Sequence, residues 1–409
     1  MSSSRFAQRP PAASLFLIVS GCVLLMFSFG LRSSFGLFVE PLDELNGWGR
    51  DVIGLALAIQ NLAWGLVAVL AGGLADRFGT VKVIVAGAVF YALGIWLVGG
   101  VDRVWVLHTS AGFLVGAGIA GTAFGLVLPA MARAVSPSRR QTVLGIGTAA
   151  GSMGQFVLVP VIQQLIEAFG WVGALNVMAV TALFMALLAM PLARTSVPPK
   201  YSGNEPRLGE ILKMARGHGS YWLLILGFFV CGFHVAFITV HMPAFLADAG
   251  FASEVAAWSI SLIGLCNVIG AFLAGVLSGR MAMRGVLIGI YAGRVIAITL
   301  FMLVPLSLPS VLIFSCVMGF LWLATVPPTT GLVAAMFGTR YMATLYGVVF
   351  LGHQFGSFWG VWLGGWLFEA TGSYAGLWWT GVVLGVVAVV LHWPIREAPV
   401  ESAGMAPAN

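Results

Sequence analysis

Charge is scarce in this sequence: charged residues make up 8% of its 409 residues, whereas hydrophobic residues make up 60%. Soluble domains carry about 25% charged residues, so the composition excludes an ordinary soluble enzyme. A mean hydropathy of +1.00 also excludes a disordered chain, which needs low hydrophobicity and high charge. The composition is therefore typical of a helical protein that crosses the membrane many times.

Cysteine is scarce as well, and the motifs of soluble enzymes are missing. The four cysteines, Cys22, Cys231, Cys266 and Cys316, lie far apart in apolar stretches, so we expect neither a disulfide framework nor a zinc site. The sequence contains no phosphate-binding P-loop, no GxSxG nucleophile elbow and no Cys/His cluster. We therefore expect no enzymatic activity, no cofactor and no bound metal, and any transport would be driven by a gradient.

Acidic side chains are missing from the middle of every predicted span. All 14 Asp and Glu residues fall at span ends or in loops, and the charges deep within spans are Arg32 and Arg294. Ionisable groups inside a membrane are costly and usually face a bundle interior or a cavity. The missing carboxylates argue against a carboxylate proton relay and against a site for an organic cation.

Twelve apolar runs are long enough to cross a bilayer, since one helical span needs about 20 residues. They lie at roughly 14–40, 50–75, 80–100, 104–131, 140–167, 172–192, 219–247, 255–279, 284–305, 309–336, 340–369 and 374–394. We predict an all-α polytopic membrane protein with twelve transmembrane helices in two pseudo-symmetric six-helix bundles. The predicted domains are an N-terminal bundle (1–193), a cytoplasmic central linker (194–218) and a C-terminal bundle with a short cytoplasmic tail (219–409).

Basic residues predict the orientation, because cytoplasmic loops carry an excess of Lys and Arg. Sixteen of the 20 basic residues fall on one side of the predicted spans, whereas the other side holds only Arg50 and Arg103. Both termini and the central linker are therefore predicted to be cytoplasmic, in a protein integral to the cytoplasmic membrane. This placement accounts for the net charge of +6 without a nucleic-acid partner.

The two halves of the sequence repeat one another. Leu144-Gly145 in the fifth span matches Tyr346-Gly347 in the eleventh, at an offset of 202 residues. The loop that follows the second span, GGLADR, is echoed after the eighth span by GVLSGR. Parallel repeats of this kind usually hold their substrate between the halves, near the membrane midplane.

Arg32 is the main candidate for binding a substrate. It lies in the outer half of the first span, and a guanidinium without a buried acid nearby suits a carboxylate, which it can hold through two parallel hydrogen bonds. The alternatives are that Arg32 extends toward the membrane surface or pairs with Glu40 or with an acidic residue of an outer loop. For Arg294, in the ninth span, a structural role in bonding backbone carbonyls or a neighbouring helix is favoured.

Three histidines lie inside predicted spans. His241, level with Arg32, and His353, on a predicted cavity helix, are candidates for binding the anion or carrying a proton, since histidine changes charge near physiological pH. The alternative is a neutral imidazole that joins helices by hydrogen bonds, which is favoured for His234. A metal site from His234 and His241 would lack a third ligand.

Uncharged polar side chains lie at a similar depth on several spans. Gln60 and Asn61 lie on the second span, Gln155 on the fifth, Asn267 on the eighth, Thr325 on the tenth and Gln354 on the eleventh. Each alone is more often a helix-packing group than a ligand contact. Together they are candidates for lining the substrate site.

The stretch GGLADRFGTVK, residues 72–82, resembles the loop 2–3 signature of the major facilitator superfamily. With twelve spans, parallel halves and a weaker second copy, the resemblance covers nearly the whole chain. It implies a conformational-switch loop formed by Gly72, Asp76, Arg77 and Gly79, with Arg280 in the second copy.

Two positions differ from the superfamily's pattern. Thr80 stands where the pattern carries a basic residue, and Gly279 replaces the acidic residue in the second copy. The charge-relay role that the resemblance implies is therefore clearer in the first half.

Within this superfamily the chain resembles bacterial monocarboxylate-porter-like members. The resemblance is carried by residues 29–41, where Arg32 stands at the place of a substrate-relevant basic residue of monocarboxylate transporters, and by residues 337–340 and 345–365. Animal relatives have an Asp/Arg pair in the eighth span, where this chain reads LCNVIG at 265–270. The proton coupling attached to that pair is not implied here, and a histidine is the favoured carrier if protons are coupled.

The leading hypothesis is a secondary active transporter that moves a small organic anion, foremost a monocarboxylate, by alternating access. Its expected partners are that anion and the lipid bilayer; a coupling proton or a counter-anion stays open, and we expect a monomer. The alternative is an exporter of amphipathic drugs or metabolites, because Trp and Phe could line an apolar cavity. A receptor or scaffold that binds without transport is a remote alternative, since few cytoplasmic residues are available for signalling.

Overall fold

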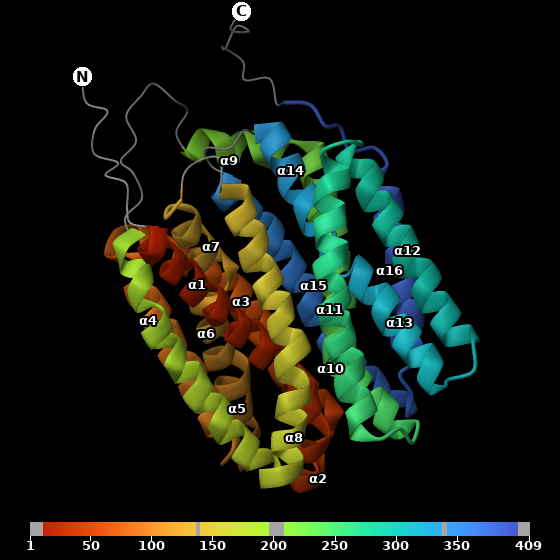
Figure 1. Cartoon of the computed structure of the whole chain (residues 1–409). Coiled ribbons are helices and arrows are strands. Elements are labelled where there is room, and N and C mark those ends of the chain that lie inside the picture. Colours follow the sequence, from red (N-terminus) through yellow and green to blue (C-terminus); the bar gives the residue numbers. More distant parts are fainter. Residues whose placement is uncertain (1–10, 136–139, 196–207, 338–341, 400–409) are drawn as a thin grey trace, which may run out of the picture.

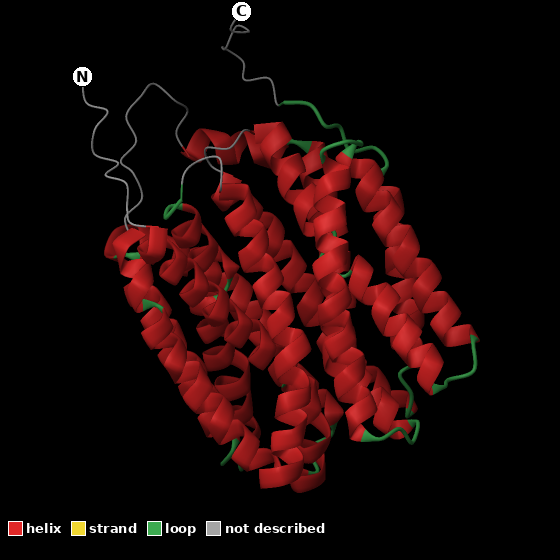
Figure 2. Cartoon of the chain, viewed as in Figure 1, coloured by secondary structure: helices red, strands yellow, loops and turns green. Residues whose placement is uncertain are grey.

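The computed structural model describes residues 11–135, 140–195, 208–337 and 342–399. These residues are mainly helical and include no β-strand (Figure 2). Among the described residues, ten helical segments are long and apolar enough to cross a membrane. Dividing α8 (Arg140–Leu188) at Gly170, where a φ of 71° reverses the chain, and adding α15 (Met342–Thr371) gives the twelve predicted passes, so the all-α polytopic fold is confirmed.

The chain forms two helical halves that lie side by side (Figure 1). The N-terminal half comprises α1 (Pro11–Ser33), η1 (Phe35–Phe38), α2 (Val39–Asn46), α3 (Arg50–Phe78), α4 (Thr80–Val98), α5 (Val104–Leu107), η2 (His108–Leu114), α6 (Val115–Thr122), α7 (Phe124–Ala132), α8 and η4 (Met190–Thr195). The C-terminal half comprises α9 (Leu208–Gly217), α10 (Gly219–Asp248), α11 (Ser253–Ser278), α12 (Met283–Leu303), α13 (Leu308–Leu321), α14 (Val326–Phe337), α15 and α16 (Ala375–His392). The described chain begins and ends on the same side of the molecule, which we call the terminus side; the opposite side is the far side. The predicted linker includes α9, and residues 196–207 lie outside the described residues.

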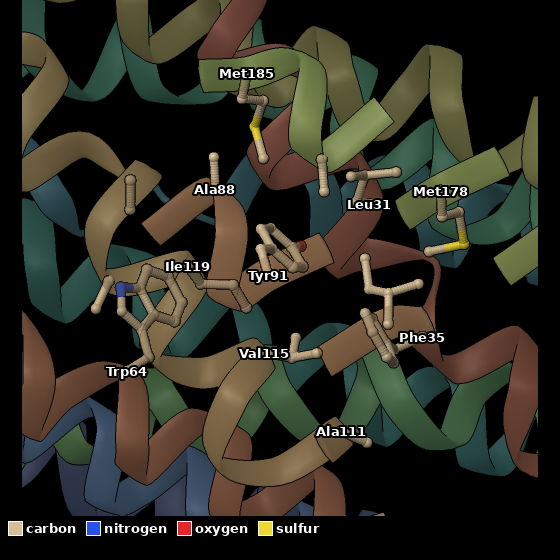
Figure 3. Close-up of a cluster of buried hydrophobic side chains, with 14 of the residues drawn as sticks. Leu31, Phe35, Trp64, Ala88, Tyr91, Ala111, Val115, Ile119, Met178 and Met185 are labelled. Carbon is tan, nitrogen blue, oxygen red and sulfur yellow. The ribbon is translucent and has the colours of Figure 1, made fainter. Parts of the chain in front are cut away.

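Each half has its own hydrophobic core. In the N-terminal core, Leu31, Trp64, Tyr91, Ile119 and Met185 come from five different helices (Figure 3). The C-terminal core is richer in aromatic rings and includes Phe228, Tyr291, Phe314 and Trp378. Because each core is built almost entirely from one half, each half packs largely within itself.

Equivalent helices of the two halves are broken near their middle. In the N-terminal half, Ala123 has an extended backbone (φ −85°, ψ −175°) and separates α6 from α7. In the C-terminal half, residues 322–325 separate α13 from α14, and Pro327 and Pro328 lie in the first turn of α14, where a missing N–H breaks no helical hydrogen bond. The spans predicted at 104–131 and 309–336 are therefore interrupted, which frees backbone carbonyls in the middle of the protein.

Helices α10 and α15 approach each other at two glycines. A Cβ added to Gly232 would overlap the carbonyl oxygen of His353, and one added to Gly356 would overlap that of Phe229. Small residues allow such close approach of helices inside a membrane. The crossing holds His353 directly beside α10.

Candidate substrate site

Arg32 lies close to the end of α1 and points toward α3. Its Nη2 donates a hydrogen bond of 2.8 Å to Asn61 Oδ1, and its guanidinium carbon lies 4.9 Å from the centre of the Trp64 ring. Its Nε is buried without a hydrogen-bond partner. The ion pairs of the described residues are Arg50–Asp248 and Arg103–Asp102, so Arg32 carries no acidic partner there. The guanidinium keeps unused hydrogen-bonding capacity for an anion.

Aromatic rings from both halves gather around Trp64, whose ring lies beside this guanidinium. Phe29 stacks on Phe124 with 4.0 Å between ring centres and meets the edge of Trp64 at 5.9 Å. From the other half, Phe350 meets Trp64 at 5.2 Å. Sequence reasoning missed Trp64; its spacing of three residues from Asn61 on one helix, which places both on the same face, was the available signal.

A hydrogen-bonded chain continues from Asn61 into the C-terminal half. Gln354 Nε2 on α15 donates to the backbone oxygen of Asn61 at 2.9 Å, and Gln354 Oε1 lies 2.9 Å from His353 Nδ1. The structure thus brings together Arg32, Asn61, Gln354 and His353, all of which are predicted site residues. Their contacts join the two halves at one depth.

Gln60 points away from this group. Its Nε2 donates a hydrogen bond of 2.8 Å to the carbonyl of Ala111, in the π-helical turn η2. A π-helical turn shifts the regular pattern of backbone hydrogen bonds, and Gln60 bonds one of its carbonyls. Gln60 therefore packs α3 against its own half.

Gln155 and Asn267 lie where α8 meets α11, which is a second junction between the halves. Gln155 Nε2 donates to the carbonyl of Ile260 at 2.8 Å. Asn267 Nδ2 donates to Ser152 Oγ at 2.9 Å, while its Oδ1 accepts from the backbone N–H of Leu323 at 2.9 Å. Asn267 thus connects the broken stretch after α13 to the N-terminal half.

The two histidines of α10 bond to backbone carbonyls of neighbouring helices. His241 Nε2 lies 2.7 Å from the carbonyl of Val361, and His234 Nε2 lies 2.7 Å from that of Gly381. In both residues Nδ1 is buried without a partner. No contact between His241 and Arg32 is present in the described structure, so His241 lies apart from the Arg32 group. No group of three or more His, Cys, Asp or Glu in the described residues has the geometry to hold a metal.

Arg294 is completely buried and bonds the carbonyl end of α13. Its Nε and Nη2 donate to the carbonyl of Leu321 at 3.2 and 2.8 Å, and Nη2 also donates to the carbonyl of Trp322. These are carbonyls at the helix break, where the negative end of the helix dipole favours a cation. The expected bonds between Arg294 and backbone carbonyls are present.

An ion-paired cluster, which we call the far-side latch, joins the halves at the beginning of α3. Arg50 holds Asp248 of α10 through two hydrogen bonds of 2.5 and 2.8 Å, and its backbone N–H donates to Glu369 of α15 at 2.8 Å. Its guanidinium also lies 4.2 Å from the centre of the Phe368 ring. Burial raises the pKa of Tyr374 to about 12, although Arg50 opposes the rise, so the neutral hydroxyl accepts a hydrogen bond from Arg50. Sequence reasoning counted Arg50 only as a basic residue of the outer side.

Several glycines on the terminus side have open space around them. Ideal Cβ atoms on Gly72, Gly145 and Gly347, at the terminus-side ends of α3, α8 and α15, would have no atom within 4 Å. In the part of the chain that the structure describes, the hydrogen bonds that join the halves run from the far-side latch to the level of Gln354 and Asn267.

The predicted switch loop forms the turn between α3 and α4. Gly79 has a φ of 94°, which favours glycine, and its N–H donates to the carbonyl of Ala75. Thr80, which replaces a basic residue of the pattern, accepts a hydrogen bond of 3.3 Å from Arg133. The side chains of Asp76 and Arg77 lie outside the described residues, and Arg280 is exposed at the end of α11.

Comparisons with known proteins agree with this architecture. A sequence model described as Major Facilitator Superfamily matches residues 21–361. The chain is 24% identical over 385 residues to the uncharacterized MFS-type transporter YcxA of Bacillus subtilis (89% of this chain, 90% of the relative). It is also 24% identical over 358 residues to monocarboxylate transporter 13 of Bos taurus (85% and 80%).

The fold also matches solved structures. A bacterial homolog of the human lysosomal transporter Spinster, in an inward-facing and unoccupied conformation, superposes with a TM-score of 0.76 at 15% identity. The match covers 94% of this chain and 97% of that one. The chain therefore belongs to the Major Facilitator Superfamily, as the loop after α3 and the parallel halves predict, and it is a membrane transporter by family.

Proposed function

We propose that this protein is a secondary transporter that moves a small monocarboxylate across the cytoplasmic membrane by alternating access. The observation that carries the proposal is the Arg32 guanidinium, which lies at the junction of the halves with a buried, unbonded Nε and no acidic partner in the described chain. A guanidinium binds a carboxylate through paired, charge-assisted hydrogen bonds. The name of the related monocarboxylate transporter 13 supports the same substrate class.

The surroundings of Arg32 favour one carboxylate with an apolar body. Asn61 orients the guanidinium and offers an amide, whereas Phe29, Trp64 and Phe350 present rings. A second carboxylate would have no cation to pair with at this position, and desolvating an unpaired charge is costly. Monocarboxylates are therefore preferred over dicarboxylates.

The described conformation supports an inward-facing state with the terminus side in the cytoplasm. The far-side latch closes one side of the substrate site, while the terminus-side glycines Gly72, Gly145 and Gly347 stand free of contacts. In the proposed cycle the bundles 1–193 and 219–409, joined by the linker 194–218, rock about the Arg32 level. The switch loop around Gly79 limits that motion on the cytoplasmic side.

The remaining predicted site residues have proposed roles that follow from their contacts. Gln354 and His353 bring the second half to the substrate level, and Gln155 and Asn267 form the α8–α11 seam. His241 joins α10 to α15 next to the latch. A monomer suffices for this mechanism, because both halves of the site lie in one chain.

Uptake into proteoliposomes tests the proposal, with acetate, lactate, benzoate and phenylacetate as labelled probes. The wild-type protein should take up at least one of them, Arg32→Ala should abolish uptake, and Arg32→Lys should retain part of it because the positive charge remains. Arg103→Ala is the matched control, since this arginine lies exposed on the far side. Uptake by Arg32→Ala at the wild-type rate would overturn the assignment of Arg32.

A second candidate function is export of amphipathic compounds, favoured by the stacked rings of Phe29 and Phe124 beside Trp64. Such a transporter would protect cells from apolar drugs. Susceptibility profiling of a deletion strain separates the two functions, because a carboxylate transporter leaves drug sensitivity unchanged.

A further inference from the structure

The middle of the C-terminal half contains a polar cluster that the substrate site does not use. At its centre is Cys231 of α10, which is completely buried. Its Sγ lies 3.2 Å from Thr325 Oγ1, in the break between α13 and α14, and 3.5 Å from Arg294 Nη2. Cys231 thus touches two groups that hold the broken helix.

Arg294 in this cluster lacks a counter-charge. It is 0% exposed, its Nη1 has no hydrogen-bond partner, and its other nitrogens bond neutral carbonyls and the Cys231 sulfur. A buried cation without an anion is strongly disfavoured. The only acidic hydrogen among its bonded partners in the described chain is the thiol of Cys231. A neighbouring arginine stabilises a thiolate.

Titratable groups face Cys231 from two further directions. His353 and Tyr346 on α15, and Tyr291 on α12 beside Arg294, lie close enough to affect Cys231 electrostatically. On α16, His392 stacks on Tyr291 at 5.0 Å, and His234, on α10 itself, lies near Arg294. The guanidinium of Arg294 and the imidazole of His353 are therefore the basic groups that face the sulfur.

The cluster is linked to the substrate site by consecutive contacts. His353 lies where α15 crosses α10 at Gly232, the residue that follows Cys231, and from His353 hydrogen bonds lead through Gln354 and Asn61 to Arg32. The chain of contacts crosses from one half to the other. A change of charge at Cys231 would therefore act on the group that binds the carboxylate.

We propose that Cys231 is a proton-binding site, in which a thiol replaces the carboxylate that the spans lack. In one state the Cys231 thiolate pairs with Arg294; in the other, one proton taken from water resides on the Cys231 sulfur. No other bond forms or breaks, and the proton returns to water when the site reopens. One proton and one carboxylate would then move together, so the coupling part of this proposal rests on the proposed function, whereas the titration of Cys231 does not.

The titration is tested directly by the infrared S–H stretching band of a purified variant in which Cys22, Cys266 and Cys316 are replaced by serine. Thiols beside a cation ionise at about 3.5–7.5 instead of about 8.5, so at least half of the band should disappear between pH 5 and pH 8. Arg294→Lys should keep the titration because the positive charge remains, and Arg294→Gln should remove it. A band that stays constant from pH 5 to pH 9 in the parent variant would overturn the proposal.

The coupling is tested in proteoliposomes with an entrapped pH dye. Addition of a transported carboxylate should acidify the lumen with the wild-type protein. Cys231→Ser should lower this proton flux about tenfold or more. Ligand-induced thermal stabilisation, which reports binding at Arg32, should stay within about twofold of the wild-type value in this variant. Cys231→Asp should restore the proton flux. Retained proton flux in Cys231→Ser would overturn the coupling, even if the thiol titrates. If no carboxylate is bound or moved by the wild-type protein, the proposed function fails, and the infrared titration still decides the proton site.

Discussion

At the scale of single residues, α3 carries two neighbouring amides that point in different directions. Gln60 bonds the carbonyl of Ala111 inside the N-terminal half, whereas Asn61 bonds Arg32 and, through its backbone oxygen, Gln354 of the other half. Successive residues of a helix are rotated by about 100° because a turn has 3.6 residues. One amide therefore serves packing and the other contacts the proposed anion site.

Asn61→Ala should weaken substrate affinity without unfolding the protein. It removes a hydrogen bond to a charged group, which is worth about 1.5–3 kcal/mol, so the KM of carboxylate uptake should rise roughly tenfold or more. Asn61→Asp should abolish uptake, because the new carboxylate would pair with Arg32 and exclude the substrate. Both are measured as initial uptake rates in proteoliposomes.

Gln60→Ala is the matched control for this pair. It should lower thermal stability by about 1 kcal/mol, since Ala111 loses a buried partner, while KM stays within about twofold. Equal effects of the two alanine variants on KM would contradict the separate roles of the amides.

The polar residues of the site could be found from the sequence because each is costly in lipid and therefore conspicuous. Their directions could not be found, since the helices that carry them are apolar on nearly every face and periodicity does not show which face is inside. Trp64 could not be singled out for a related reason: the sequence contains 14 Trp and 28 Phe, and nothing in the sequence distinguishes this one as a site residue.

At the scale of elements, the close contact of α10 and α15 determines where His353 and Gln354 lie. Gly356 faces the carbonyl of Phe229. Gly347, which lies nearer the beginning of the same helix, faces no atom within 4 Å. A glycine-to-alanine substitution can therefore be compared at a crowded and at an open position of one helix.

Gly356→Ala should destabilise the protein, because the added methyl overlaps a backbone carbonyl and forces the helices apart. Overpacking of this kind costs about 1–3 kcal/mol. Thermal unfolding of the purified protein in detergent measures the effect. Gly347→Ala should be neutral or stabilising by up to about 1 kcal/mol, because alanine favours the helix; a larger loss at Gly347 than at Gly356 would show that the crossing is not held by close packing.

Helix number and approximate bounds could be predicted from the sequence, since hydrophobic runs of sufficient length specify spans. The break between α13 and α14 could not be placed, because it depends on contacts from elsewhere in the chain. Arg294, from α12, bonds the freed carbonyls, and Asn267, from α11, bonds the N–H of Leu323. Neither partner is visible in the local sequence of the broken helix.

At the scale of the whole molecule, one arginine joins several helices of the two halves on the far side. The single residue Arg50 contacts three partners: Asp248 on α10, Glu369 on α15 and Tyr374 before α16. The sequence placed Arg50 correctly on the side that holds few basic residues, but its partners lie 198 to 324 residues away. An ion pair between distant residues depends on the arrangement of the halves, which the sequence pattern alone does not specify.

The far-side latch should bias the protein toward the described conformation, so weakening it should shift the population toward the state that is open on the far side. Asp248→Asn removes the negative charge of the ion pair with Arg50. The Arg50 side chain is largely buried, and it donates two hydrogen bonds to Asp248. Every 1.4 kcal/mol lost changes the ratio of the two states about tenfold.

Spin labels at Gly145→Cys and Gly347→Cys report the change, because both positions are free of contacts on the terminus side. In this background Cys22, Cys266 and Cys316 are serine and the buried Cys231 stays unlabelled. With Asp248→Asn the distance distribution should gain a shorter component, as the terminus side closes. Asp102→Asn, which disrupts the exposed pair with Arg103, should leave the distribution unchanged. Identical distributions for both variants would mean that the Arg50–Asp248 pair does not control the opening of the far side.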